Sequence, residues 1–237
     1  MKETKRGYSP KDTLEFGPKA QPLLNLAAEE IYYLINRGYD IKSCSTFIGN
    51  HYLLSERQRL VLARMLSPRK SLTHRQEKLL PPDAKLDTVH IDGFNTIITL
   101  EIALSGSLLI QGLDGTVRDI AGLRGTYRII DKTEAAVSLI LNYLDTAKVN
   151  HAVFYLDRPV SNSGRLKQLI EETAANHKVN VTFEIINDVD RILYPLANVI
   201  TTDAIILDKC KSWYNLNRYI IEQNIEEPWV FKLNMNI

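Results

Sequence analysis

The stretch VHIDGFNTIITL (residues 89–100) carries the pattern that decides the fold. A short apolar run ends at Asp92, Gly93 follows at once, and Asn95 precedes a second apolar run. A short apolar run that ends at a turn signal is typical of a buried strand in a parallel sheet. Asp92 is then either a loop residue or the first ligand of a metal site, and Asn95 either a turn residue or part of that site.

From residue 87 onward, strand patterns alternate with helix patterns. Further strands are predicted at SLLIQ, HAVFYLD, VTFEII and VITTD, and helices at DKTEAAVSLILNYLDTA, SGRLKQLIEETAANH, DVDRILYPL and SWYNLNRYIIEQN. Asp131 and Glu134 fit an N-terminal cap for the first of these helices. The alternation predicts a three-layer α/β/α fold with a mostly parallel central sheet.

The residues before 87 have a different pattern, which predicts a small all-α domain. PLLNLAAEEIYYLINRG has apolar residues at helical spacing, and LSERQRLVLARML opens with a capping box at Ser55 and Gln58. Proline and glycine near the start, and a Pro-Pro pair later, indicate irregular segments. The predicted organisation is a flexible arm at 1–21, a basic α-helical domain at 22–67, a linker at 68–86 and an α/β domain at 87–237.

The net charge of +1 hides an asymmetry between these two parts. Residues 1–86 hold 15 Lys and Arg against 9 Asp and Glu, whereas residues 87–237 hold 14 against 19. A basic part joined to an acidic part suggests contact with a polyanion beside a cation site, and Arg57, Arg59 and Arg64 are candidate nucleic-acid contacts. The simpler interpretation is that the basic residues only solvate exposed helices.

Several functional classes are excluded by what the sequence lacks. The two cysteines, Cys44 and Cys210, form no CxxC pair, which argues against a zinc–thiolate site and for a reducing compartment. No apolar run has the length of a membrane span, and the polar N-terminus has no secretory signal. We therefore expect a cytoplasmic protein with no membrane partner.

Acidic residues recur where the predicted strands end. Asp92, Asp157 and Asp203 close three strands, and Asp188 and Asp190 follow a fourth. The carboxyl ends of parallel strands meet at one edge of a sheet, and like charges gathered there are unfavourable without a cation. Oxygen ligands without thiolates suit Mg²⁺ or Mn²⁺. Each aspartate taken alone is explained at least as well as a helix N-cap, so the metal site depends on their coincidence.

Two of these segments carry short motifs, IDGFN (91–95) and DVDRILYPLANVITTDAIIL (188–207). The first resembles the opening motif of PIN-like nucleases, especially the NYN branch, and the second resembles a later block of that superfamily. The resemblance covers roughly residues 87–210. It implies a metal-dependent endoribonuclease, a hydrolase of phosphodiester bonds. The residues that match the superfamily's site are Asp92, Asn95, Asp157, Asp190 (or Asp188), Thr201 and Asp203.

The whole chain also resembles an uncharacterised prokaryotic family of two-part proteins. In that family a stretch like NRGYDIKSCSTFIGNHYLLSERQR (36–59) precedes a domain that opens with IDGFNT. This second resemblance supports the division of the chain and implies no activity.

Other polar segments offer contacts for phosphate. The glycine-rich segment 112–128 carries Arg118, Arg124 and Arg128 and is either a phosphate-contacting loop or a flexible surface loop. Ser161 and Ser163 stand at a predicted helix start, where they either bind phosphate or cap the helix. The histidines His90 and His151 lie within strands and are expected to be structural.

The predicted function is a cytoplasmic metal-dependent ribonuclease that acts on RNA or another nucleic acid. In it Mg²⁺ or Mn²⁺ is bound by the strand-end acids, Asn95 orients Asp92 or contacts phosphate, and Thr201 supports the site. One alternative is a catalytically inactive PIN-like adaptor that binds RNA or protein. Another is a nucleotide-binding phosphotransfer domain that uses the glycine-rich segment. Self-association is left open.

Overall fold

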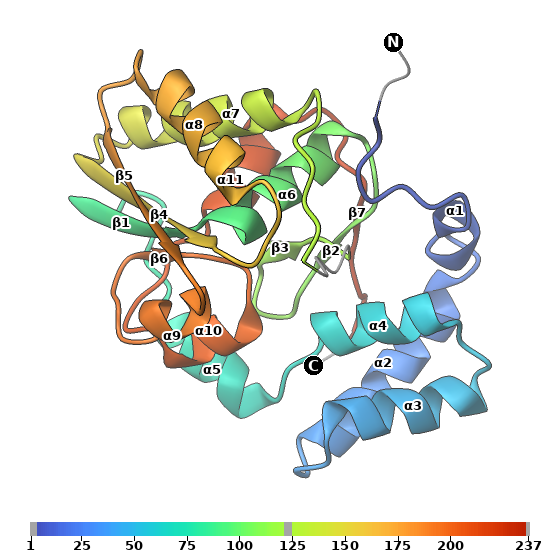
Figure 1. Cartoon of the computed structure of the whole chain (residues 1–237). Helices are drawn as coiled ribbons and strands as arrows, with labels where there is room; N and C mark the ends of the chain where they lie inside the picture. Colours follow the sequence, from blue (N-terminus) through green and yellow to red (C-terminus); the bar gives the residue numbers. More distant parts are fainter. Residues whose placement is uncertain (1–3, 121–124, 236–237) are drawn as a thin grey trace.

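The computed structural model describes residues 4–120 and 125–235, which form a helical N-terminal region and an α/β region (Figure 1). The N-terminal region consists of α1 (Asp12–Glu15), α2 (Gln21–Ile35), α3 (Ile41–His51) and α4 (Glu56–Met65). The predicted fold, a mostly parallel sheet between helical layers preceded by a small helical part, is confirmed. No helix in the described part of the chain has the length and apolar character needed to cross a bilayer.

The central sheet is parallel, and within the described residues it has the strand order β5-β4-β1-β6. Its strands are β1 (Thr88–Asp92), β4 (His151–Asp157), β5 (Asn180–Ile186) and β6 (Val199–Ile200). In this register Asp92 pairs with Tyr155, and Ile91 pairs with Ile200. The carboxyl ends of all these strands therefore lie along one edge of the sheet.

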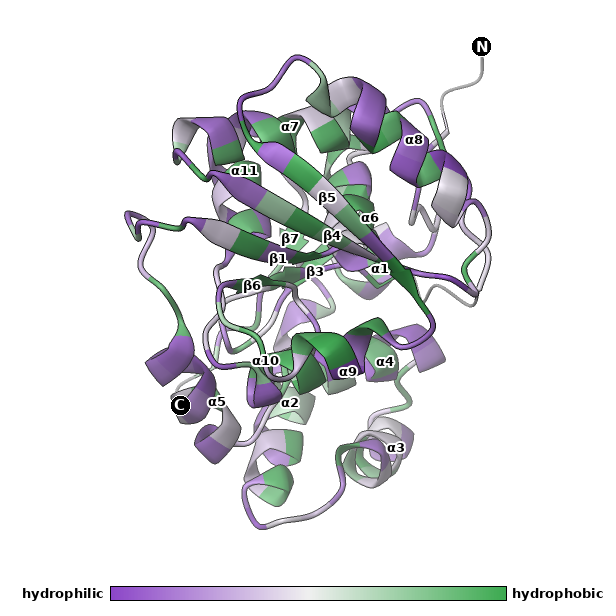
Figure 2. Ribbon diagram, turned by 60° about the vertical axis from the view of Figure 1, so that its left-hand side comes forward, coloured by the Kyte–Doolittle hydropathy of each residue, from purple (hydrophilic) through white to green (hydrophobic). Residues whose placement is uncertain are grey.

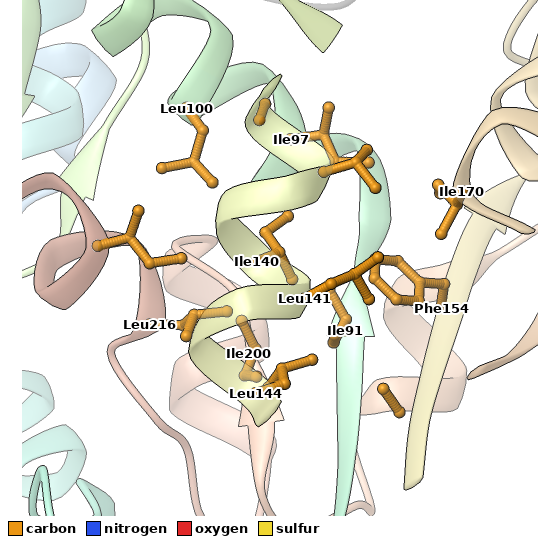
Figure 3. Close-up of a cluster of buried hydrophobic side chains, with 14 of the residues drawn as sticks. Ile91, Ile97, Leu100, Ile140, Leu141, Leu144, Phe154, Ile170, Ile200 and Leu216 are labelled. Atoms are coloured by element: carbon orange, nitrogen blue, oxygen red, sulfur yellow. The ribbon is translucent and has the colours of Figure 1, made fainter. Parts of the chain in front are cut away.

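One face of the sheet packs against a layer made by α6 (Gly93–Leu104), α7 (Thr133–Thr146), α8 (Ser163–Ala174) and α11 (Leu216–Asn224). Figure 3 shows Ile91 and Phe154 of the strands against Ile140 and Leu141 of α7. Alternate residues of β4 supply this core, because successive strand side chains point to opposite faces. The removal of these side chains from water is the main force that holds the layer in place.

The opposite face packs against α9 (Val189–Leu193), α10 (Ala204–Lys209) and the segment around Trp213. Val153 and Tyr155, which alternate with the β4 residues of the first core, supply the sheet side of this second core. Here His90 Nδ1 lies 2.9 Å from the hydroxyl of Tyr155, so this histidine is structural as predicted. His151 is also engaged within the sheet, with Nε2 2.8 Å from the hydroxyl of Thr182.

A second, smaller sheet joins the two regions. It has the order β3-β2-β7 and consists of β2 (Leu109–Gln111), β3 (Val117–Arg118) and β7 (Val230–Phe231). The SLLIQ segment is thus a strand, but it lies outside the central sheet. Leu109 faces the core beneath α6, whereas Ile110 and Phe231 face the core of the N-terminal helices. The two regions therefore share a continuous set of buried contacts.

The segment expected to be a flexible arm is packed where the structure describes it. Asp12 is 1% exposed and accepts hydrogen bonds of 2.5 and 2.9 Å from the guanidinium of Arg57. The ring of Phe16 lies edge-on to Phe231 with centroids 5.5 Å apart. Both partners are distant in sequence, so local pattern gave no sign of them.

The segment 68–86, expected to be a linker, contains the helix α5 (Arg69–Lys78). This helix is hydrophilic along nearly its whole length (Figure 2) and lacks an apolar stripe. It is held by polar contacts instead: Arg75 is 2% exposed, and its carbonyl accepts a 2.8 Å hydrogen bond from Trp213 Nε1. Because helix patterns are recognised by their apolar period, a helix of this kind escapes them.

The helix caps agree with prediction in one case and differ in another. The capping box at Ser55 and Gln58 is present at the start of α4. The predicted cap at Asp131 is wrong, since α7 begins after Lys132 with no side-chain cap. The hydroxyl of Thr133 accepts from the backbone N–H of Ile130 and donates to the buried Glu101, and this hydrogen-bond pair fixes the start of α7.

Candidate active site

Asp92 lies at the carboxyl end of β1 and is 7% exposed. Its Oδ2 accepts a 2.8 Å hydrogen bond from the hydroxyl of Thr201, the residue that follows β6. The Thr201 hydroxyl in turn accepts from the backbone N–H of Asp203 at 3.1 Å. Although Asp92 precedes α6 directly, its side chain makes no capping hydrogen bond. The helix-cap interpretation is therefore wrong for this residue.

Gly93 lets α6 begin directly at the sheet. A Cβ atom at this position would lie 2.6 Å from Leu156 Cδ2 and 2.9 Å from the carbonyl oxygen of Tyr155. Both distances are shorter than side chains tolerate, and one of them involves backbone. The Asp-Gly pair in the sequence thus places an acid at the strand end and keeps the next turn of chain close to β4.

Asn95 lies in the first turn of α6, so its interpretation as a turn residue is wrong. Its Oδ1 accepts from the backbone N–H of Thr202 at 2.8 Å and from the hydroxyl of the same residue at 2.9 Å. Asp92 and Asn95 therefore hold two successive threonines after β6. The motif of the first strand and the motif of the last strand are joined by direct hydrogen bonds.

Two of the other acids do cap helices. Asp203 is the N-cap of α10 and accepts from the backbone N–H groups of Ile205 and Ile206 at 2.8 and 3.1 Å. Asp188 is the N-cap of α9 and accepts from the backbone N–H of Arg191 at 3.3 Å. Capping fixes the orientation of both carboxylates and leaves each with oxygen lone pairs for a further partner.

The remaining acids stand at the same edge of the sheet. Asp157 is the last residue of β4 and is half-buried. Asp190 follows in the first turn of α9, one turn after β5, and is exposed. Neighbouring strands β1 and β4 thus end in aspartates, and the chain that follows β5 and β6 supplies the others.

The charges of these groups interact. Burial raises the pKa of Asp92 to about 8; the Thr201 hydrogen bond opposes this shift, and Asp203, Asp190 and Asp157 add to it. Although Asp190 is exposed, the protein atoms around it remove part of its hydration and raise its pKa, and Asp203 and Asp157 raise it further. The pKa of Asp157 is raised by burial, with a backbone hydrogen bond from Val189 acting in the opposite direction. The predicted acids therefore share one electrostatic neighbourhood around Asp92.

These carboxylates do not form a closed metal cage. Across residues 4–120 and 125–235, no group of three or more His, Cys, Asp and Glu side chains is arranged to hold a metal ion. Mg²⁺ usually keeps several waters and binds through one or two carboxylates together with substrate phosphate, so an open site of oxygen donors fits it chemically. A buried carboxyl with a raised pKa also favours a cation, because a cation stabilises the ionised form.

A cavity of about 240 Å³ lies between α4 and α10, and one of the candidate-site acids, Asp203, is part of its lining. We refer to it as the α4–α10 cavity. It is lined by Ala63, Arg64, Leu66, Ser67, Asn95, Arg118, Asp119, Thr202, Asp203, Ala204 and Ile205. The helical N-terminal region therefore forms one wall of a pocket whose opposite wall belongs to the candidate site. Thr202, Asp119 and Ser67 were not expected there, since no local pattern links segments so distant in sequence.

The three predicted phosphate-binding arginines of α4 differ in their surroundings. Arg57 is paired with Asp12, and Arg59 donates to Leu54 O at 2.9 Å and to Asn50 Oδ1 at 2.8 Å. These two guanidinium groups are engaged within the N-terminal region and are not brought to the acids. Arg64 is the member of the set that lines the α4–α10 cavity.

Residues 116–120 of the glycine-rich segment do not form a surface loop, whereas Gly125, Thr126 and Arg128 are exposed. Thr116, Val117, Arg118, Asp119 and Ile120 are all buried. The Arg118 guanidinium donates to the hydroxyl of Thr116, to the carbonyl of Arg64 and to the carboxylate of Asp114. All three of its nitrogens thus have protein partners, which does not favour a loop that wraps a nucleotide.

The other predicted phosphate contacts of this part of the chain are not assembled into one site. Arg128 is exposed, and its carbonyl accepts from Arg6. Arg124 lies outside the described residues. The hydroxyl of Ser161 donates to Tyr127 O at 3.0 Å, and that of Ser163 donates to backbone carbonyls of Asp157 and Val160. Both serines hold the loop before α8, and neither caps the helix, because its N-cap is Asn162 and no side chain makes a capping hydrogen bond there.

A network of ion pairs that the sequence did not predict connects the elements around α10. Arg75 of α5 bonds Asp208 of α10 at 2.6 Å and Asp114 at 2.7 Å, and Asp114 also pairs with Arg118. The side chains of Arg75 and Asp114 are 3% and 2% exposed. The network links α5, α10 and the segment before β3, and so fixes the position of the helix that begins at Asp203.

Comparison with known proteins describes the chain in two parts. Residues 82–219 match a family described as "Domain of unknown function (DUF5616)", and residues 23–78 match one described as "Protein of unknown function (DUF434)". The boundary between the two matches falls within residues 68–86. All the acids of the candidate site lie in the first match.

Relatives add no activity to these descriptions. "Uncharacterized protein MJ0935" of Methanocaldococcus jannaschii is 36% identical over 183 residues, which cover 76% of this chain and 87% of that protein. No solved structure gives a significant match. Because the match to residues 82–219 spans more than half of the chain, the protein belongs to the family described as a domain of unknown function, DUF5616.

Proposed function

We propose that this protein is a divalent-metal-dependent ribonuclease that hydrolyses phosphodiester bonds at the Asp92 site and acts in the cytoplasm. The observation that carries the proposal is that acids from separate strand ends lie at one edge of the sheet and that their charges act on one buried aspartate. Asp92 is 7% exposed and hydrogen-bonded to Thr201, and its charge interacts with those of Asp157, Asp190 and Asp203. Such an arrangement is unfavourable by itself and becomes favourable when a cation binds.

The proposed roles follow from the contacts of each side chain. Asp92 would be the central ligand of Mg²⁺ or Mn²⁺, and Asp157, Asp190 and Asp203, which lie at the same edge of the sheet, would supply further oxygen ligands. A bound divalent cation would supply positive charge that polarises the phosphate and activates water. Thr201 orients Asp92 through its 2.8 Å hydrogen bond, and Asn95 holds Thr202 so that α10 begins at a fixed place.

The test is cleavage of single-stranded and structured RNA by the full chain with Mg²⁺ or Mn²⁺. We expect Asp92→Asn to abolish cleavage and Asp190→Asn to reduce it strongly. Asp131→Asn is the matched control, because Asp131 is exposed, pairs with Lys132 and is not among the acids whose charges raise the pKa of Asp92. No cleavage of varied RNA and DNA with either metal would overturn the proposal, as would full activity of Asp92→Asn.

A second candidate function is a non-catalytic RNA-binding adaptor. It is favoured by the absence of a closed metal cage among the described residues and by the capping roles of Asp188 and Asp203. This alternative predicts RNA binding that tolerates Asp92→Asn and gives no heat of metal binding in calorimetry. The nuclease proposal predicts that metal binding is measurable and is lost in the same variant.

A further inference from the structure

The α4–α10 cavity brings Arg64 of the N-terminal helical region beside Arg118 and Asp203 of the α/β region. Arg64 comes from α4, Arg118 from the end of β3, and Asp203 from the start of α10. The charge of Arg118 interacts with those of Asp203 and Arg64, so these groups are close in space. A pocket with guanidinium groups on one wall and a carboxylate on the other suits an anion that bridges arginine and a metal ion.

The two arginines differ in their freedom to bind a ligand. Arg118 is 7% exposed and all its nitrogens have protein partners, so it contributes a fixed positive charge. Arg64 keeps 36% of its side chain exposed. Its Nη1 donates to Asp119 O at 2.9 Å, and the Asp119 carboxylate lies 3.7 Å away, longer than a hydrogen bond. The other N–H groups of the Arg64 guanidinium can therefore donate hydrogen bonds to an anion in the cavity.

The size of the cavity limits what it can hold. Its volume of about 240 Å³ is below the roughly 300–1,000 Å³ of sites that enclose drug-sized ligands. A phosphate with part of its sugar is of suitable size, whereas a run of several nucleotides is not. Asn95 and Thr202 supply amide and hydroxyl groups at the wall that faces the acids.

The charges of the cavity also set a condition for binding. Its lining carries two positive groups, Arg64 and Arg118, and two negative ones, Asp119 and Asp203, so the walls offer an anion no net positive charge. A divalent cation at the neighbouring acids would make the net charge around the cavity positive. Binding of phosphate and of the cation should then favour each other, and thermodynamic linkage requires the same factor in both directions.

We infer that the α4–α10 cavity is a phosphate subsite for one nucleotide unit, with Arg64 as its ligating side chain, and that it fills together with the divalent cation. The inference rests on the proposed function, because it places the subsite beside the metal ligands of the nuclease. It assigns the N-terminal helical region a direct role: α4 completes the site rather than only attracting nucleic acid at a distance.

Calorimetric titration of the full chain tests this inference with three probes. Uridine 5′-monophosphate carries a terminal phosphate, the dinucleotide UpU carries only a bridging phosphate, and uridine carries none. Each is titrated with and without Mn²⁺. We expect Mn²⁺ to strengthen binding of a phosphate-bearing probe, and that probe to strengthen Mn²⁺ binding by the same factor. The comparison of the monophosphate with UpU distinguishes a terminal from a bridging phosphate.

Variants assign the effect to the cavity. Arg64→Ala should weaken the phosphate-bearing probe about tenfold or more, because a charge-assisted hydrogen bond is lost. Ala63→Phe is the second variant, since it fills the cavity from α4 without removing charge. Arg37→Ala is the matched control, because Arg37 stacks on Tyr33 and does not line the cavity. Thermal unfolding of each variant confirms that it is folded.

The outcomes separate this inference from the proposed function. Equal binding of uridine and both phosphate probes, or equal binding by wild type and Arg64→Ala, overturns the subsite. Absence of any binding by the wild-type protein also overturns it. If phosphate binding depends on Arg64 and on the cation but the protein cleaves no RNA, the subsite is supported and the nuclease proposal is wrong. If the protein cleaves RNA but Arg64→Ala leaves phosphate binding unchanged, only the subsite is wrong.

Discussion

The hydroxyl of Thr201 donates a 2.8 Å hydrogen bond to Oδ2 of Asp92 and so joins the ends of the neighbouring parallel strands β6 and β1. The bond lies in a buried setting, where Thr201 is 3% and Asp92 is 7% exposed. It lowers the pKa of Asp92 against the stronger effect of burial. The same bond therefore determines both where the carboxylate points and how readily it ionises.

Removing this hydrogen bond should weaken metal binding. Thr201→Val keeps the shape of the side chain but leaves Asp92 without its donor, so we expect about tenfold lower Mn²⁺ affinity and about 1 kcal/mol lower stability. Calorimetry and urea unfolding measure the two effects. Thr146→Val is the control, because the exposed Thr146 bonds only the carbonyl of Asn142 in its own helix. Unchanged Mn²⁺ affinity in Thr201→Val would show that this bond does not orient a ligand.

The raised pKa of Asp92 predicts a pH-dependent stability of the metal-free protein. The folded value is about 8 and the ordinary value 3.8, so between them the folded state keeps a proton that the unfolded state has released. The free energy of unfolding therefore falls as pH rises from about 4 to about 8. The stabilisation that this bound proton provides is complete below the pKa of Asp92 in the unfolded chain and is lost above the pKa of Asp92 in the folded protein.

Asp92→Asn removes this titration. In the presence of a chelator, we expect the free energy of unfolding of the variant to rise relative to that of wild type as pH rises, by several kcal/mol near pH 8. Urea unfolding across this pH range measures the difference, and Asp131→Asn is the control. Parallel stability curves for wild type and Asp92→Asn would mean that Asp92 is not the buried acid described above.

Gly93 should tolerate no side chain. Gly93→Ala places a Cβ atom 2.6 Å from Leu156 and 2.9 Å from the Tyr155 carbonyl, so α6 must shift from the sheet. We expect a loss of about 2 kcal/mol in the free energy of unfolding, together with weaker metal binding because Asp92 moves with the helix. Gly164→Ala in α8 is the control, since nothing lies within 4 Å of its added Cβ. If Gly93→Ala and Gly164→Ala lowered the free energy of unfolding equally, the close approach of α6 to β4 at Gly93 would be contradicted.

Arg75 should be essential to the fold despite its place in a hydrophilic helix. Arg75→Ala leaves Asp114 and Asp208 without their shared partner, and breaking a buried pair typically costs about 3–5 kcal/mol. Denaturant unfolding measures the loss. Arg69→Ala on the same helix is the matched control, because Arg69 is exposed, and it should change stability by less than about 0.5 kcal/mol. Similar free energies of unfolding for Arg75→Ala and Arg69→Ala would show that the contacts of α5 do not stabilise the fold.

Much of the architecture was predictable from hydrophobic period alone. Continuous apolar runs such as HAVFYLD, and helices with apolar residues at three- and four-residue steps, predicted strands and helices that the structure contains. The acids at the strand ends could be predicted for the same reason, since a parallel sheet aligns its carboxyl ends whatever the side chains are. Local chemistry sufficed for the Ser55 capping box as well.

Long-range polar contacts decided the rest, and no local pattern encodes them. Helix α5 depends on Arg75 meeting Asp114 and Asp208, which lie 39 and 133 residues away in the chain. Arg64 looks like Arg57 and Arg59 in the sequence, yet it alone of the three lines the α4–α10 cavity, because α4 packs against the small sheet. Periodicity reports which side of an element is apolar, whereas the partner of a polar side chain is set by how the elements meet in space.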